Sequence, residues 1–118
     1  MPPPAGTSSV MTPLPEVNSA NVEATLASPV PVLLEFGARW CPPCRMLAPQ
    51  VEAIAAHYAG RLRVATCDTD ESPDLATRFN IRSVPTLLLF KSGQVVGQLV
   101  GAVPRARLES LLARAGVP

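Results

Sequence analysis

The sequence predicts an α/β fold with a central mixed sheet of four to five strands flanked by helices on both faces. Short apolar segments typical of buried strands alternate with segments of helical periodicity, which favours parallel strands joined by helices. Two more strand segments then follow one another across a two-residue turn, which indicates an antiparallel hairpin. A last helical segment closes the chain, so helices are available for both faces of the sheet.

The first half of the chain begins with a short helix. Asn18 or Ser19 can cap this helix, which runs to about Ala27. The next segment, 32–36, is short and mostly apolar, as expected for a strand that is buried on both faces. Apolar residues then recur at helical spacing, and they predict a long amphipathic helix over 42–58.

The second half begins after Gly60, which separates the long helix from the next strand. Ser72, Pro73 and Asp74 offer a cap, a proline at the first helical position and an acidic first turn, so they predict a helix start. The predicted elements of this half are a strand over 62–68, a helix over 73–79, strands over 86–91 and 94–100, and a helix over 104–115.

Length and composition predict one domain. A chain of 118 residues with 47% hydrophobic residues can bury a core without metals or disulfide staples. Residues 1–15, rich in Pro, Ser and Thr, are expected to form a flexible tail before a domain over 16–118. This tail lacks the features of an export signal, and no later segment is long enough to span a bilayer. We therefore expect a cytoplasmic protein without membrane association.

The net charge of +1 argues against a nucleic-acid-binding protein. The arginines are scattered singly along the chain, whereas a nucleic-acid interface needs a basic patch or stripe. Binding to nucleic acid is therefore not expected.

The segment with the most chemical information is Cys41-Pro42-Pro43-Cys44, which lies between the strand 32–36 and the long helix. Unpaired N–H groups and a partial positive charge at a helix start stabilise a thiolate there. Cys41 lies at this start and is the expected nucleophile, whereas Cys44 lies about one turn inside the helix. Their spacing lets the two sulfurs close a disulfide, so the pattern favours reversible thiol–disulfide exchange.

His57 and Cys67 are the other candidate metal ligands in the sequence. Zinc sites normally need four ligands, and the spacings of His57 and Cys67 fit no zinc finger, so no metal site is expected. Cys67 lies in the predicted strand 62–68 and is interpreted as a small buried hydrophobe, with a regulatory thiol as the alternative. His57 lies near the end of the long helix and is interpreted as a surface residue.

The chain resembles the thioredoxin family from about Glu16 to its C-terminus. The resemblance rests on three separated segments, which are 32–36, the segment from Ala38 to Pro49, and 81–90. It implies the thioredoxin fold and a protein disulfide reductase in which Cys41 attacks and Cys44 resolves. The alternatives are a disulfide oxidase or isomerase of the same fold, or a non-catalytic binding or chaperone-like module.

The resemblance also implies further site residues. It implies a cis peptide bond before Pro85, opposite the cysteines, and a role for Glu35 as the buried acid that exchanges a proton with Cys44. The expected substrate-binding residues around Cys41 are Gly37, Trp40, Pro42, Pro43, Val84, Pro85 and Gly101.

The resemblance further implies the partners. Substrates would be proteins that contain disulfides, and an NADPH-dependent thioredoxin reductase would restore the dithiol. The nicotinamide and the flavin would belong to that reductase, so this chain would bind no cofactor. It is expected to act as a monomer.

Four positions depart from the common thioredoxin pattern. Pro42 stands where glycine is usual, and it removes a backbone N–H near the Cys41 sulfur. Glu35 replaces the usual buried Asp, Thr66 replaces a neighbouring Lys, and Gly37 replaces the first Trp of the motif. Because Glu35 lies in an apolar strand without that Lys, we expect burial to raise its pKa.

Overall fold

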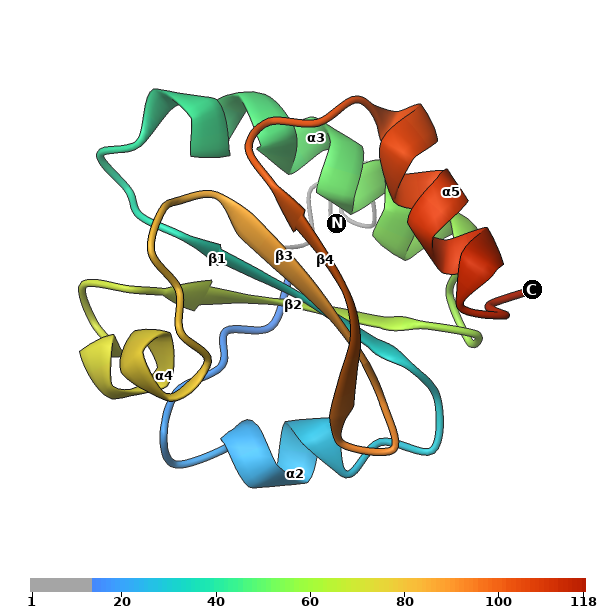
Figure 1. Cartoon of the computed structure of the whole chain (residues 1–118), viewed down its shortest axis with the longest axis horizontal. Coiled ribbons are helices and arrows are strands. Elements are labelled where there is room, and N and C mark those ends of the chain that lie inside the picture. The colour runs from blue at the N-terminus through green and yellow to red at the C-terminus, as the bar shows by residue number, and fades with distance from the viewer. Residues whose placement is uncertain (1–13) are drawn as a thin grey trace, which may run out of the picture.

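The computed structural model describes residues 14–118, which form a four-stranded mixed sheet with helices on both faces (Figure 1). The strands lie in the order β2-β1-β3-β4. Strand β1 pairs in parallel with β2 and antiparallel with β3, and β3 pairs antiparallel with β4. The strands are β1 (Val32–Gly37), β2 (Arg63–Asp68), β3 (Thr86–Lys91) and β4 (Gln94–Val100).

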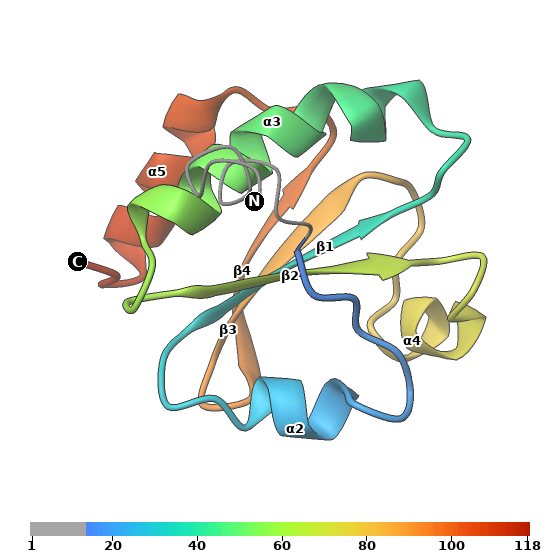
Figure 2. The ribbon, with the colours of Figure 1, turned by 180° about the vertical axis from the view of Figure 1, so that it is seen from behind.

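The helices form one layer on each face of this sheet. Helices α3 and α5 cover one face and α2 and α4 cover the other, as Figures 1 and 2 show from opposite sides. Their bounds are α2 (Val22–Leu26), α3 (Pro42–His57), α4 (Pro73–Arg78) and α5 (Arg105–Arg114). In the described part of the chain, none of these helices combines the length and the hydropathy needed to cross a membrane.

Strand β1 is buried on both faces because both helix layers cover it. Leu33 belongs to the apolar cluster under α3 and α5, whereas Leu34 and Phe36 belong to the cluster under α2 and α4. This alternation follows from the two-residue period of a strand. It explains why the segment is apolar on both faces, and it places Glu35 on the α3 face.

The predicted fold class is confirmed, and the sheet has four strands. A single bridge between Glu16 and Thr66 adds to the free edge of β2. Here the Val17 N–H donates to the Thr66 carbonyl at 2.7 Å, and the Thr66 N–H donates to the Pro15 carbonyl at 2.9 Å. The predicted tail, 1–15, falls almost entirely outside the described residues.

The first helix starts later than predicted. Its N-cap is Asn21, not Asn18 or Ser19, and α2 ends at Leu26. The side chain of Asn18 instead accepts the backbone N–H of Ala20 at 2.9 Å. Asn therefore stabilises a turn ahead of the helix, which is the local bonding that competes with helix formation at this residue type.

The packing of α5 on the sheet depends on Gly97 in β4. A Cβ at this position would lie 2.5 Å from Cδ1 of Leu111, which is buried. The pairing of β3 with β4 is also irregular here, since Leu89 pairs with Gly97 but Phe90 pairs with Val95. This leaves Val96 as the extra residue of a β-bulge.

We expect Gly97→Ala to lower the free energy of unfolding by about 1–3 kcal/mol, because the added methyl overpacks the contact with Leu111. Chemical denaturation of the variant and the wild type measures this difference. Gln98→Ala, at the exposed neighbouring position of β4, is the control and should change stability little. Equal stability of Gly97→Ala and the wild type would mean that Leu111 moves aside freely.

Candidate redox site

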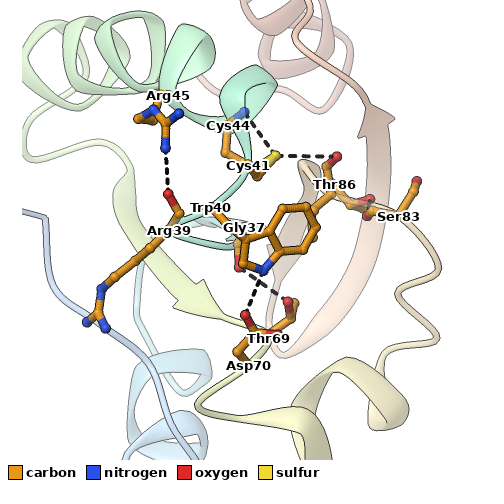
Figure 3. Close-up of a disulfide and its surroundings, with 11 residues drawn as sticks. Gly37, Arg39, Trp40, Cys41, Cys44, Arg45, Thr69, Asp70, Ser83 and Thr86 are labelled. Carbon is orange, nitrogen blue, oxygen red and sulfur yellow. Dashed lines mark hydrogen bonds between the residues drawn. A yellow bond between two sulfur atoms is a disulfide. The ribbon is translucent and has the colours of Figure 1, made fainter.

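Cys41 and Cys44 form a disulfide at the start of α3, just beyond the end of β1 (Figure 3). Their Cα atoms are 5.3 Å apart, within the usual range for a disulfide. Cys41 is the N-cap of α3 with extended backbone, and Cys44 is the third residue of the helix. The pair therefore has the helix-terminal position that the motif predicts.

The Cys41 sulfur lies among backbone groups of two segments. The backbone N–H of Cys44 donates to it at 3.2 Å. On the other side, the sulfur lies 3.8 Å from the carbonyl oxygen of Val84, which can accept the thiol hydrogen once the disulfide is reduced. A donor and an acceptor thus flank the sulfur in a way that suits both its thiolate and its thiol.

Pro85 follows Val84 and begins the approach to β3. The Val84–Pro85 peptide bond is cis, as the resemblance implies. The carbonyl of Pro85 accepts the backbone N–H of Gly101 at 2.8 Å. Gly101 has a positive φ of 96°, a conformation that favours glycine. This hydrogen bond ties the loop after β4 to the loop that faces Cys41.

A groove of about 450 Å³ lies beside Cys41. Trp40, Pro43 and Val84 line it together with Cys41. The side chain of Trp40 is 64% exposed, so it is not a core residue. Its indole Nε1 donates to Oδ2 of Asp70 at 2.7 Å, which holds the ring in place beside the disulfide (Figure 3).

The other predicted binding residues lie elsewhere around the disulfide. Pro42 is exposed at the first position of α3. Gly101 is hydrogen-bonded to Pro85, and neither of these two residues lines the groove. Gly37 does not line the groove, because it lies on the Cys44 side of the disulfide.

Gly37 lines a second cavity, of about 220 Å³, together with Glu35, Cys44 and Thr66. A Cβ on Gly37 would lie 3.2 Å from Oε2 of Glu35 and 3.3 Å from Sγ of Cys44. The carboxyl and the sulfur therefore approach the same point of the backbone. This places Glu35 next to Cys44, as expected for a group that exchanges a proton with this thiol.

Burial raises the pKa of Glu35 from 4.5 to about 7. The residue is only 7% exposed, and no charge or hydrogen bond from the described residues opposes the effect. Its direct neighbour on β2 is Thr66, which carries no charge. The carboxyl can therefore both accept and donate a proton near neutral pH.

The remaining candidates have structural positions. Cys67 is 1% exposed, and burial above all, with nearby carboxylates, raises its pKa to about 11. A buried thiol with such a high pKa is almost entirely protonated at neutral pH and is therefore unreactive. This agrees with the interpretation of Cys67 as a small buried hydrophobe. His57 is exposed in the last turn of α3. Over residues 14–118, no three His, Cys, Asp or Glu side chains gather where they could hold a metal ion.

Sequence reasoning missed Asp70 and the far wall of the groove, which includes Thr69, Ile81 and Arg82. Asp70 lies just after β2, and Trp40 lies just after β1. Because β1 and β2 are parallel, the loops after their carboxyl ends meet at the same edge of the sheet. From this rule, the sequence alone could have predicted that the loop with Trp40 lies close to the loop with Asp70.

Comparison with known proteins agrees with this geometry. The family model described as thioredoxin matches residues 13–114. A thioredoxin of Synechocystis sp. is 48% identical over 103 residues, which are 86% of this chain and 96% of the relative. Thioredoxin 1 of Nostoc sp. is 50% identical over 90 residues, which are 76% of this chain and 84% of the relative. A chloroplastic M-type thioredoxin of Pisum sativum is 48% identical over 86 residues, 73% of this chain and 50% of the relative.

Proposed function

Because the chain belongs to the thioredoxin family, we propose that Cys41 and Cys44 divide its thiol–disulfide exchange into attack and resolution. The family membership makes the protein a thiol–disulfide oxidoreductase of the protein-disulfide reductase type. The observation that carries the division of roles is the position of the two sulfurs in α3. Cys41 is the N-cap and accepts a backbone N–H, whereas Cys44 lies in the helix beside Glu35.

The reaction begins with the Cys41 thiolate. It attacks one sulfur of the substrate disulfide, forms a mixed disulfide and releases the other substrate sulfur as a thiolate. Glu35 accepts the proton of Cys44, and the Cys44 thiolate then attacks the Cys41 sulfur. This step closes the Cys41–Cys44 disulfide and releases the second substrate thiolate. Two electrons have then passed from the protein to the substrate.

The groove beside Cys41 is the proposed docking site for the substrate. It is lined by an exposed indole, a proline ring and an apolar side chain, which suit a segment of another protein. The Val84 carbonyl, close to the Cys41 sulfur, offers a backbone acceptor to an extended chain. Trp40, Pro43 and Val84 are therefore the proposed contact residues, and Pro85, next to Val84, is proposed with Pro42 and Gly101 to flank them.

Partners follow from the same chemistry. Disulfide-containing proteins are the substrates, and a reductase partner returns the electrons. The two cysteines carry both electrons, so the chain works without a bound cofactor, and NADPH and flavin belong to the reductase. We further propose a cytoplasmic monomer, as the cyanobacterial relatives suggest, although relatives described as chloroplastic also occur.

Reduction of insulin disulfides by dithiothreitol, with and without the protein, tests the proposed activity. We expect the protein to accelerate insulin precipitation, and Cys41→Ser to remove the acceleration. An unaccelerated reaction would favour a non-catalytic binding module. Equilibration with glutathione buffers then separates a reductase from an oxidase or isomerase, since a reductase holds its disulfide in buffers that reduce an oxidase.

The two prolines at the start of α3 are expected to differ in their effect on the Cys41 thiolate. An N-cap side chain accepts N–H groups from the second or third helical residue. The structure assigns Pro42 to the first position and Pro43 to the second, so Pro43 is the residue that withholds a usable N–H. The missing N–H donor to the Cys41 sulfur, which sequence reasoning assigned to Pro42, is therefore assigned to Pro43.

We therefore expect Pro43→Ala to let the Cys41 thiolate form at lower pH than in the wild type, by about one pH unit for one added charge-assisted hydrogen bond. Pro42→Ala is the matched control and should move the titration less. Ultraviolet absorbance of the thiolate during a pH titration of the reduced proteins measures both. A larger effect of Pro42→Ala would contradict the assignment of the donor.

A further inference from the structure

The Cys41–Cys44 disulfide can be reached from two sides. Cys41 lines the groove of about 450 Å³, and Cys44 lines the cavity of about 220 Å³ beside Gly37. Of the two residues, Cys44 is the more exposed, at 7% against 2% for Cys41. The cavity is smaller than a pocket for a drug-sized ligand. It therefore suits a small molecule and excludes a protein segment.

Gly37 leaves the side of Cys44 uncovered. Even a Cβ at this position would lie 3.3 Å from the Cys44 sulfur, and Gly37 and Cys44 line the same cavity. A buried carboxyl, Glu35, also points to this space without a hydrogen-bond partner among the described residues. The Cys44 sulfur and the Glu35 carboxyl therefore lie side by side at the same cavity.

The electronic asymmetry of the disulfide favours attack at Cys44. The rate of thiol–disulfide exchange rises when the leaving sulfur is a more stable thiolate. If a reductant attacks Cys44, Cys41 leaves, and its thiolate receives the Cys44 N–H at the helix start. If it attacks Cys41, Cys44 must leave as a thiolate beside the buried Glu35 carboxyl. The choice between these two attacks depends on access to each sulfur as well as on the leaving thiolate.

The lining of the cavity indicates which reductants fit. Arg39 and Arg45 lie on its wall, where the Arg45 guanidinium donates to the Arg39 carbonyl at 2.6 Å (Figure 3). Glu16, Asp68 and Glu35 lie on the same wall. The mixed charges give no net attraction for an anion. Uncharged thiols smaller than a tripeptide match both the size and the charge of the space.

We propose that small uncharged thiols reduce this protein directly by attacking Cys44 through the Gly37 cavity. The proposal rests on the proposed function in one respect, because it takes from it that Cys41 forms the more stable thiolate and is therefore the better leaving group. The incoming thiolate forms a disulfide with Cys44, and the Cys41–Cys44 bond breaks with Cys41 leaving as a thiolate. A second thiol then attacks the sulfur of the first. This releases Cys44, which takes a proton from Glu35, and leaves the two thiols joined as a disulfide.

The first test locates the adduct. The oxidised full chain is mixed with 2-mercaptoethanol, quenched with acid after short times, alkylated at its free thiol and mapped by peptide mass spectrometry. We expect the mercaptoethanol adduct on Cys44 and the alkyl group on Cys41. The reverse pattern at the shortest times would overturn the proposal.

The second test closes the cavity. Gly37→Ala and Ala48→Leu fill it from β1 and from α3, and the second variant leaves Gly37 unchanged. Each should slow reduction by 2-mercaptoethanol about tenfold, which corresponds to about 1.4 kcal/mol in activation free energy. Ala56→Leu, at an exposed position of α3, is the matched control. Unchanged rates in both cavity variants would also overturn the proposal.

A third measurement separates this proposal from the proposed function. Reduction of insulin uses the groove, so Ala48→Leu supplied as the dithiol protein should still reduce insulin at the wild-type rate in a single turnover. Failure of the wild type in that assay would refute the reductase function itself. Attack of 2-mercaptoethanol on Cys41 in a protein that reduces insulin normally would refute only the route through the cavity.

Discussion

Cys41→Ser is expected to lose all reduction of protein disulfides, whereas Cys44→Ser is expected to keep the first step and stop there. Attack needs only the Cys41 thiolate, which the helix start and the Cys44 N–H stabilise. Release of the substrate needs the second sulfur. Cys44→Ser should therefore accumulate a stable mixed disulfide with its substrates, which non-reducing gel electrophoresis and mass spectrometry detect.

The Cys67→Ser variant is the matched control for this pair. Cys67 is buried in β2 and is not part of the Cys41–Cys44 disulfide, so its loss should leave both attack and release intact. Substrates trapped through Cys44 in the Cys41→Ser protein would reverse the assigned roles. Trapping through Cys67 would mean that a reactive thiol had been mistaken for a core residue.

The second large effect concerns Glu35 and the pH dependence of stability. The pKa of Glu35 is 4.5 in the unfolded chain and about 7 in the folded protein. Between these values the folded state binds more protons than the unfolded state, so stability falls as pH rises through this window. Above about pH 7, burial of the charge lowers the free energy of unfolding by about 3 kcal/mol relative to acid pH.

We expect Glu35→Gln, which keeps the shape but not the titration, to gain stability over the wild type as pH rises from 5 to 8. The difference between the two proteins should grow by about 2.5 kcal/mol in denaturant titrations across this range. Glu52→Gln, at an exposed position of α3, should show no such growth. A difference that does not depend on pH would mean that the carboxyl is solvated in the folded protein.

The same variant tests the catalytic role of this acid. Loss of a positioned acid–base group slows proton transfer by about a hundredfold or more. Glu35→Gln should therefore release substrate from the mixed disulfide about a hundredfold more slowly near pH 7. The deficit should shrink at high pH, where Cys44 ionises without help. Single-turnover kinetics across pH measure this, and a wild-type pH profile would leave Glu35 without a catalytic role.

Local patterns explain how much could be predicted from the sequence. The buried strand β1, the helix start at Cys41 and the turn before β4 depend on neighbours within a few residues, and the structure has them where the patterns indicate. The error at Asn18 arose because a capping residue can also close a turn. Both outcomes use the same side-chain oxygen, so residue type alone cannot separate them.

The parts of the site that are close in sequence were predicted, whereas a contact between distant residues was missed. The cysteines are close in sequence, but the bond between Trp40 and Asp70 joins residues 30 positions apart. That contact depends on where the ends of β1 and β2 meet. The position of Gly37 was predictable in principle, because alternation along β1 places it on the same face as Glu35. The resemblance instead assigned Gly37 to the substrate-binding groove. It describes the usual family pattern, in which a Trp occupies this position, and so it does not indicate the space that Gly37 leaves beside Cys44.

The spacing of the two redox cysteines has a consequence for the unfolded chain. Their sequence separation is 3, so the disulfide closes a very small loop. The entropy that a cross-link removes from a denatured chain rises with loop length, and here it is small. Oxidation therefore restricts the denatured chain less than a cross-link over a long loop would. The protein can gain and lose this bond in each catalytic cycle while its folding equilibrium continues to depend on the sheet and its two layers of helices.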